Sequence, residues 1–444
     1  MKRKNTLMLI IIIVLTISTG CQKVETKNIS SEKQVFREKN QIVNASNTAE
    51  EIIELTLWSH YGGWELYLEA FRKKHPNIHI KTVVFPYSDY PSILMNALAE
   101  GDTPDLIVLD SPHFGAFNGM RGLQDLLEEP FKADRYKNDF TDALWKVGLS
   151  FDEEQLLGIP FNTSPKVTYY RTDIMESYGF PSEPDALAAF IQNPHNWLEI
   201  AKRLQKEDKW IVQWPHEPVE ILESQIGQYD KELNLLRDQE TFSEVISIAK
   251  TIRQQSLASH IDIWSDEGRQ AIKEDKIAML YLGSWGAQSI EIWAPEQAGK
   301  WRVTELPFGV KGWSNASIIA ISDLSENKEA AWEFIEFFTF EALGENMIGS
   351  VAGYLPARNH PNTIDYTNDF LGGQKEQAFY ERIQNEVQEH TLTPLDEKAK
   401  VIWKEGIYRG LDWGMAPKEI IESIIRRLEA ELGRDREILL QSLQ

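Results

Sequence analysis

Apolar and polar positions follow two periods from about residue 54 onward. Three short apolar runs of β type stand at 54–59, 78–85 and 105–109. Between them, 64–71 and 91–99 repeat their apolar residues at the spacing of one helix face. Pro76 and Gly101 follow these two stretches, as expected after helix ends. This β-α-β-α-β order predicts an α/β fold with a mainly parallel sheet and helices on both faces.

The rest of the chain mixes helical periods with isolated β-type runs. Helix faces are predicted around 197–204, 245–252, 331–338 and 421–428. Two β-type runs, 276–282 and 316–321, each adjoin a turn that contains glycine. Ligands of open α/β sheets bind beyond the carboxyl ends of the strands, so the polar and aromatic ends at 59–63, 86–89 and 110–113 are expected to form a site.

The first 21 residues combine a basic start with a short apolar stretch. Three basic residues at 2–4 precede an apolar run from about 7 to 17, which is shorter than the roughly 20 residues that a membrane-spanning helix needs. This arrangement is typical of a secretory signal peptide. The run ends in Ser18-Thr19-Gly20-Cys21, which resembles the lipobox of bacterial lipoproteins.

Cys21 is the only cysteine in the chain. The lipobox resemblance implies that residues 1–21 act as a lipoprotein signal peptide. It also implies that lipidated Cys21, carrying a palmitate-type chain, attaches the protein to the extracytoplasmic face of the cell membrane. An uncleaved signal-anchor helix with an incidental cysteine is the alternative. Residues 22–50 are polar and lack an apolar period, so they are expected to form a flexible tether.

The composition fits an exported protein of two folded domains. The chain has 444 residues, 42% hydrophobic and 26% charged, which excludes extended disorder and a multi-spanning membrane protein. A net charge of −22 argues against nucleic acid and against an anionic membrane surface as partners of the folded part. The 14 Trp, 14 Tyr and 19 Phe favour a surface for flat, weakly polar ligands, although aromatic residues more often pack in a core.

Motifs for catalysis, phosphate binding and metal binding are absent from the sequence. No G-x-x-x-x-G-K-[ST] or G-x-G-x-x-G occurs, and the turn at 283–286 lacks the glycine that a nucleophile elbow needs two residues before Ser284. His216 to Glu220 misses H-E-x-x-H, because Glu220 replaces the second histidine and Pro218 interrupts the helix. We therefore expect no catalytic residue, metal or cofactor. A carboxylate pair for glycoside hydrolysis has no fixed spacing, so an exported carbohydrate-active enzyme is the first alternative.

Six segments of the chain carry motifs of a known family. They are LTLWSHYGGWELYLEAFRKKHPNIHIKTVVF, LMNALAEGDTPDLIVLD, LLGIPFNTSPKVTYYRTDIMESYGF, IKEDKIAMLYLGSWG, NKEAAWEFIEFFTF and GYLPAR. In this order they resemble the bacterial extracellular solute-binding proteins of family 1, the sugar-binding class that includes maltose-binding protein. The resemblance covers roughly residues 52–440. Two positions depart from the family's pattern: Arg171 replaces a usual Asn, and Trp313 enters a loop that is often mostly glycine.

The resemblance implies a periplasmic-binding-protein-like α/β fold of two discontinuous lobes, joined by a hinge, with the site in the cleft between them. Lobe 1 would comprise 51–160 and 307–356, and lobe 2 would comprise 161–306 and 357–444. The resemblance also implies a binding protein rather than an enzyme, which delivers a sugar or oligosaccharide to the permease subunits of an ABC importer. The second alternative is the same fold with another solute, such as a peptide, a polyamine or a glycerophosphodiester.

A sugar ring has an apolar face and a rim of hydroxyl groups, and these define the residues expected in the cleft. Aromatic faces cover the C–H side, and Asp, Asn, Glu or Arg side chains bind the hydroxyls. The candidates at loop positions are His60, Tyr61, Tyr87, Asp110, Asn162, Trp214, Trp285, Trp313 and Tyr354. Core packing is the alternative for each tryptophan, capping for Asp110 and a hinge turn for Asn162. Trp58, which lies within a strand, is expected to be core.

Overall fold

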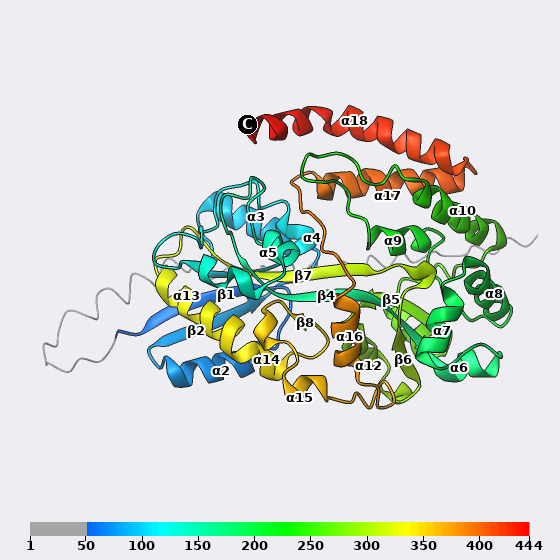
Figure 1. Cartoon of the computed structure of the whole chain (residues 1–444), viewed down its shortest axis with the longest axis horizontal. Helices are drawn as coiled ribbons and strands as arrows, with labels where there is room; N and C mark the ends of the chain where they lie inside the picture. The colour runs from blue at the N-terminus through cyan, green and yellow to red at the C-terminus, as the bar shows by residue number, and fades with distance from the viewer. Residues whose placement is uncertain (1–50, 444) are drawn as a thin grey trace, which may run out of the picture. The chain divides into compact units, whose positions relative to one another are not determined.

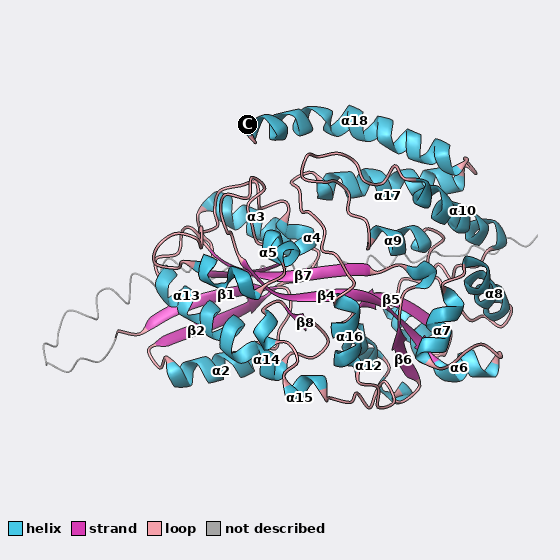
Figure 2. Ribbon diagram, in the orientation of Figure 1, coloured by secondary structure: helices cyan, strands magenta, loops and turns pink. Residues whose placement is uncertain are grey.

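The computed structural model of the chain describes residues 51–443. These residues form an eight-stranded sheet with helices packed around it (Figures 1 and 2). The predicted signal peptide, its Cys21 and the predicted tether lie outside the described residues.

The N-terminal part of the sheet has the predicted topology. Strands β1 (Ile53–Ser59), β2 (Ile78–Val84) and β3 (Leu106–Asp110) lie in the order β2-β1-β3 and are parallel. Helices α2 (Glu65–Lys74) and α3 (Tyr90–Glu100) connect them. Helix α3 ends at Gly101, whose φ of 75° is a left-handed conformation that glycine adopts without strain.

The rest of the sheet is antiparallel, so the expectation of a mainly parallel sheet is wrong. The further strands are β4 (Ile159–Arg171), β5 (Met279–Gly283), β6 (Trp301–Thr304), β7 (Gly312–Ile321) and β8 (Val351–Ala352). Strand β7 pairs antiparallel with both β3 and β4, and β4 pairs antiparallel with β5, β6 and β8. Strand β7 enters beside β3 from a distant part of the chain, without the direct crossover that parallel neighbours need.

Strands β4 and β7 run side by side across the middle of the sheet (Figure 1). Their pairing shifts register twice. On β4, Phe161 is an extra residue between the partners of Ile318 and Ser317, and on β7, Ser314 is an extra residue between the partners of Ser164 and Pro165. Each extra residue is a bulge, which reverses the alternation of side chains between the two faces of the strand.

Helices surround the sheet along its length. They are α4 (Ser111–Phe114), α5 (Asp142–Val147), α6 (Thr172–Ser177), α7 (Pro184–Ile191), α8 (Pro194–Gln205), α9 (Glu217–Glu223), α10 (Glu240–Gln255), α11 (Asp266–Lys273), α12 (Gly286–Trp293), α13 (Lys328–Glu336), α14 (Leu343–Asn346), α15 (Pro361–Ile364), α16 (Glu376–Gln384), α17 (Asp396–Asp412) and α18 (Pro417–Ser442). The four predicted helix faces are confirmed as parts of α8, α10, α13 and α18.

The buried apolar side chains form three clusters. The first joins β1 to β3, α2 and α13, and includes Phe71 and Leu109. The second is built on α8, α10 and α17, with Trp197 and Trp403 fully buried. The third fills the space around β5 and β6 and includes Trp301. The boundaries of the two lobes stay a prediction.

The segment before α17 packs behind β7. The ring of His390 meets the ring of Trp313 edge-on, with centroids 5.3 Å apart, and its Nε2 is enclosed without a hydrogen-bond partner. Burial, with a smaller effect from the charge of Arg237, lowers the pKa of His390 to about 4. The folded protein therefore keeps this histidine neutral at pH values where an unfolded chain would protonate it.

His390 is predicted to make the protein less stable as the pH falls from about 6.5 to about 4. Only the unfolded chain takes up the proton in this window, which lowers the unfolding free energy by up to about 3 kcal/mol. The check is chemical denaturation across this range for the wild type, His390→Gln and His195→Gln, which changes an exposed histidine. The wild type and His195→Gln should share a slope that His390→Gln reduces. An unchanged slope in His390→Gln would contradict the prediction.

Candidate functional site

A cleft of about 1300 Å³ opens at the carboxyl ends of the three parallel strands. The loops after β1 and β2 and the end of β3 form one side of its lining. The bulged parts of β4 and β7, helix α12 and the loop that follows α14 form much of the rest, together with Trp264 and Arg269 at α11. The strand ends that the sequence singled out therefore meet at one cavity, as expected for an open α/β sheet.

A line of polar side chains crosses three neighbouring strands at the floor of the cleft. Ser317 of β7 lies opposite Asp110 of β3 on one side and Asn162 of β4 on the other. The Ser317 hydroxyl donates to Asp110 Oδ1 at 2.8 Å, and its backbone N–H donates to Asn162 Oδ1 at 2.9 Å. His60 Nε2 lies 3.4 Å from the other carboxylate oxygen of Asp110. These contacts fix the carboxylate where a ligand can reach it.

Aromatic rings from the first two loops stand beside this polar line. The ring of His60 contacts Tyr61 and Tyr87 edge-on, with centroids 4.7 and 5.1 Å apart. Tyr61 stacks on Trp64 at 5.6 Å, and the Trp64 indole donates to the Tyr61 carbonyl at 3.0 Å. The Tyr61 hydroxyl is buried without a hydrogen-bond partner. Burial, and then the nearby charge of Asp110, raises the pKa of Tyr61, so this hydroxyl stays protonated and can donate to a ligand.

Tryptophans form another part of the lining, at the start of α11 and α12. Trp285 immediately precedes α12, and its indole nitrogen lies 3.4 Å from Asn315 Oδ1. A Cβ atom on Gly283 would come within 2.3 Å of that nitrogen, so the glycine allows the ring its position. Trp264 lies next to Trp285, with centroids 5.9 Å apart. Sequence reasoning missed Trp264; the signal available was its place directly before Ser265, whose side chain caps α11, which puts it in a loop rather than inside a helix.

Six of the nine candidates line the cleft. They are His60, Tyr61, Tyr87, Asp110, Asn162 and Trp285. Their roles toward a ligand stay a prediction. Trp58 packs against Phe85 at the edge of the first apolar cluster, with centroids 4.8 Å apart, and is only partly buried.

Three candidates do not line the cleft, which corrects the expectation for them. Trp313 is part of strand β7 rather than a loop, and its indole donates to the Thr163 hydroxyl at 3.0 Å in the core. The bulge at Ser314 reverses the alternation of side chains, so Trp313 faces away from the cleft that Asn315 lines.

The other two candidates outside the cleft are held by aromatic neighbours elsewhere. Trp214 lies edge-on to His260, with centroids 5.7 Å apart. Tyr354 packs against Phe340 at 5.0 Å, beside the first apolar cluster. The unusual Arg171 is also away from the cleft, where it pairs with Asp173 at 2.7 Å and Asp275 at 2.5 Å. It therefore has a structural role.

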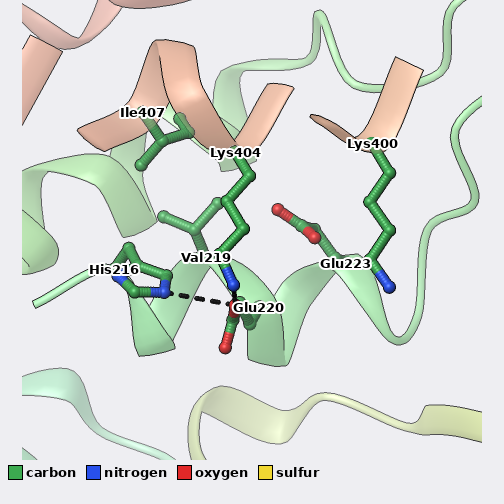
Figure 3. A pocket seen from close by; sticks show the side chains of 7 residues that line it. All are labelled: His216, Val219, Glu220, Glu223, Lys400, Lys404 and Ile407. Carbon is green, nitrogen blue, oxygen red and sulfur yellow. Dashed lines mark ion pairs between the residues drawn. The ribbon is translucent and has the colours of Figure 1, made fainter. Parts of the chain in front are cut away.

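A second pocket lies between α9 and α17, with a volume of about 20 Å³ that suits one water molecule (Figure 3). It holds the motif that resembles H-E-x-x-H. His216 Nε2 lies 3.2 Å from Glu220 Oε1, and Lys404 approaches the same oxygen at 3.5 Å. Burial opposes the charge of Glu220, but His216, Lys166 and Lys404 together lower its pKa to about 2. The carboxylate is thus already neutralised by protein cations.

Neither a metal centre nor a membrane span occurs in the described part of the chain. Within residues 51–443, no three His, Cys, Asp or Glu side chains gather in a way that could hold a metal ion. In the same range, no helix combines the length and the apolar character needed to cross a bilayer.

The comparison with protein families identifies the class. Residues 67–369, more than half of the chain, match the family described as bacterial extracellular solute-binding protein. The chain therefore belongs to this family. The structure has the corresponding α/β fold of two lobes with a cleft between them.

Individual relatives are distant but cover most of the chain. The lactose-binding protein of Rhizobium radiobacter is 25% identical in an alignment of 359 positions that covers 72% of this chain and 79% of that protein. The galacto-N-biose/lacto-N-biose I-binding protein of Bifidobacterium longum aligns with a TM-score of 0.71 at 18% identity, covering 86% of this chain and 98% of that one. An ABC-transporter-associated binding protein of Bifidobacterium animalis subsp. lactis, in complex with β-1,6-galactobiose, has a TM-score of 0.68 at 17% identity, covering 87% and 99%.

The different surroundings of Trp313 and Trp285 predict different effects of truncation. Trp313 is 5% exposed and hydrogen-bonded in the core, so Trp313→Ala should lower the unfolding free energy by about 3–5 kcal/mol. Trp285 borders the cleft and is partly exposed, so Trp285→Ala should cost clearly less. Urea denaturation of both variants without ligand measures the difference. An equal or larger loss in Trp285→Ala would mean that its ring belongs to the core.

Proposed function

We propose that this protein is the lipid-anchored receptor of an ABC importer and that it captures a neutral sugar or oligosaccharide. The observation that carries the proposal is the charge balance of the cleft. Among the described residues that line it, Asp110 is the one acidic side chain, and Arg269 is the one basic side chain besides His60. The remaining lining is aromatic, aliphatic or made of Ser, Asn and Gln side chains with a histidine.

This balance favours a neutral ligand over charged solutes. A polyamine would require several carboxylates, and a phosphodiester would be expected to have clustered cations beside it. A neutral sugar needs a few fixed hydrogen-bonding groups and an aromatic face, and the cleft contains both. The similar proteins, which include a lactose-binding protein and a binding protein in complex with β-1,6-galactobiose, support the same class.

Residues on the two sides of the cleft would recognise different parts of the sugar. Asp110, in lobe 1 of the proposed division, would accept hydrogen bonds from sugar hydroxyls, with Asn162 and the Tyr61 hydroxyl nearby. Trp285, in lobe 2, would cover the C–H face of a ring. Because the ligand would contact both lobes, binding would shift the population toward a closed state that the permease subunits can recognise.

The cleft also favours binding without catalysis. Glycoside hydrolysis generally uses two carboxyl groups on either side of the scissile bond. Asp110 is the one carboxylate among the described residues that line the cleft, and it already accepts a hydrogen bond from Ser317. The ATP-hydrolysing subunits of the importer would be separate chains.

The test is calorimetry of the body from residue 51 onward against galactosides, maltosides and other saccharides from one to four rings, with chromatography of the recovered ligand. At least one saccharide should bind and be recovered unchanged. Asp110→Asn should weaken that binding about tenfold or more, because hydrogen bonds to a charged acceptor contribute about 1.5–3 kcal/mol. Asp102→Asn, which changes an exposed carboxylate, should bind normally. Binding of none of these saccharides, or their cleavage, would refute the proposal.

Anchoring through Cys21 predicts a separate result. Cys21→Ala should release the protein from the membrane fraction or leave it unprocessed, because no lipid can be attached. Ligand affinity of the purified body should not change. Fractionation with mass spectrometry of the N-terminus checks this, and Ser18→Ala serves as a variant that keeps the cysteine. A wild-type protein whose N-terminus still carries residues 1–20 would favour the signal-anchor alternative.

A further inference from the structure

Trp264 has a large apolar side chain that is exposed to solvent at the edge of the cleft. It is 49% exposed and lines the cleft, yet its backbone is fixed on both sides. Its N–H donates to Asp262 Oδ1 at 3.0 Å, and its carbonyl accepts from Arg269 Nη2 at 3.1 Å. A ring that is exposed but already ordered loses little conformational entropy when a ligand covers it.

The ring of Trp264 extends the surface of Trp285. The two centroids lie 5.9 Å apart with planes tilted by 42°, and Trp293 supports Trp264 edge-on at 5.1 Å and 88°. The two indole rings are therefore neighbours in the lining of the cleft. Neighbouring rings of an oligosaccharide are joined through a single oxygen atom, so each could cover one of the two faces.

The volume of the cleft and the presence of Arg269 in its lining also favour a ligand of more than one ring. At about 1300 Å³, it exceeds the roughly 300–1000 Å³ of typical small-molecule pockets. Arg269 lines the cleft, and its guanidinium donates a hydrogen bond to the Trp264 carbonyl. A hydrogen-bond donor therefore lies beside Trp264, whereas the acceptor Asp110 lies in the polar line across β3, β7 and β4.

We infer that Trp264 is a second stacking position beside Trp285, so that the cleft is built for a saccharide of at least two rings. This inference rests on the proposed function and specifies its ligand. The inner ring lies over Trp285 within reach of Asp110, and the outer ring lies over Trp264 beside Arg269. Trp264 is thus a specificity-determining residue for ligand length.

The test compares a disaccharide with its component monosaccharides, using lactose with galactose and glucose, and maltose with glucose, together with the longer members of the same panel. The best disaccharide should bind at least tenfold more tightly than its monosaccharides. Trp264→Ala should weaken disaccharide binding about tenfold and change monosaccharide binding less than twofold. Trp264→Phe should restore most of the loss, whereas Trp285→Ala should weaken both.

Trp413→Ala is the matched control, because this tryptophan is 73% exposed and is not among the residues that line the cleft. If monosaccharide binding is too weak to measure, the result still agrees with the inference. The loss of disaccharide affinity in Trp264→Ala is then the deciding measurement. Equal losses for both ligand lengths, or no loss for either, would overturn the inference while saccharide binding itself upholds the proposed function. Absence of binding by every saccharide would instead refute the proposed function.

Discussion

The antiparallel pairing of β4 with β7 is the constraint on which the rest of the site depends. These strands cross the middle of the sheet, and their shared register places Ser317 opposite both Asp110 and Asn162. A single serine thereby connects three strands through hydrogen bonds of 2.8 and 2.9 Å. The two bulges turn additional side chains toward the cleft and turn Trp313 away from it. Backbone register, rather than the choice of any one side chain, therefore sets the composition of the cleft.

Charge has different roles on the surface and in the cleft. The chain has a net charge of −22, which keeps an exported protein soluble and disfavours anionic partners. In the cleft, one carboxylate and one guanidinium stand among uncharged groups. Between α9 and α17, Glu220 pairs with His216 and Lys404, so its charge already has partners within the protein. The net charge of the chain thus bears on solubility, whereas the charged groups in the cleft bear on the class of ligand.

The aromatic side chains of the cleft are held by contacts with neighbouring residues. Tyr61 is stacked on Trp64, and Trp285 occupies space that Gly283 leaves free. Trp264 is held from its backbone and supported by Trp293. A receptor that must bind and then release its ligand benefits from such rigid surfaces, because little binding energy is lost in ordering them.

The sequence by itself determined the local elements and much of the site. Short apolar runs and helix faces predicted β1 to β3, α2 and α3, and Asp110 was found because it ends a buried strand. These features depend on neighbours in the chain, so their pattern is visible in the sequence. Only the tertiary structure decided the antiparallel part of the sheet, the core position of Trp313 and the place of Trp264 in the cleft. These depend on how distant strands pair and where a bulge reverses their faces, and residue spacing along the chain contains no record of either.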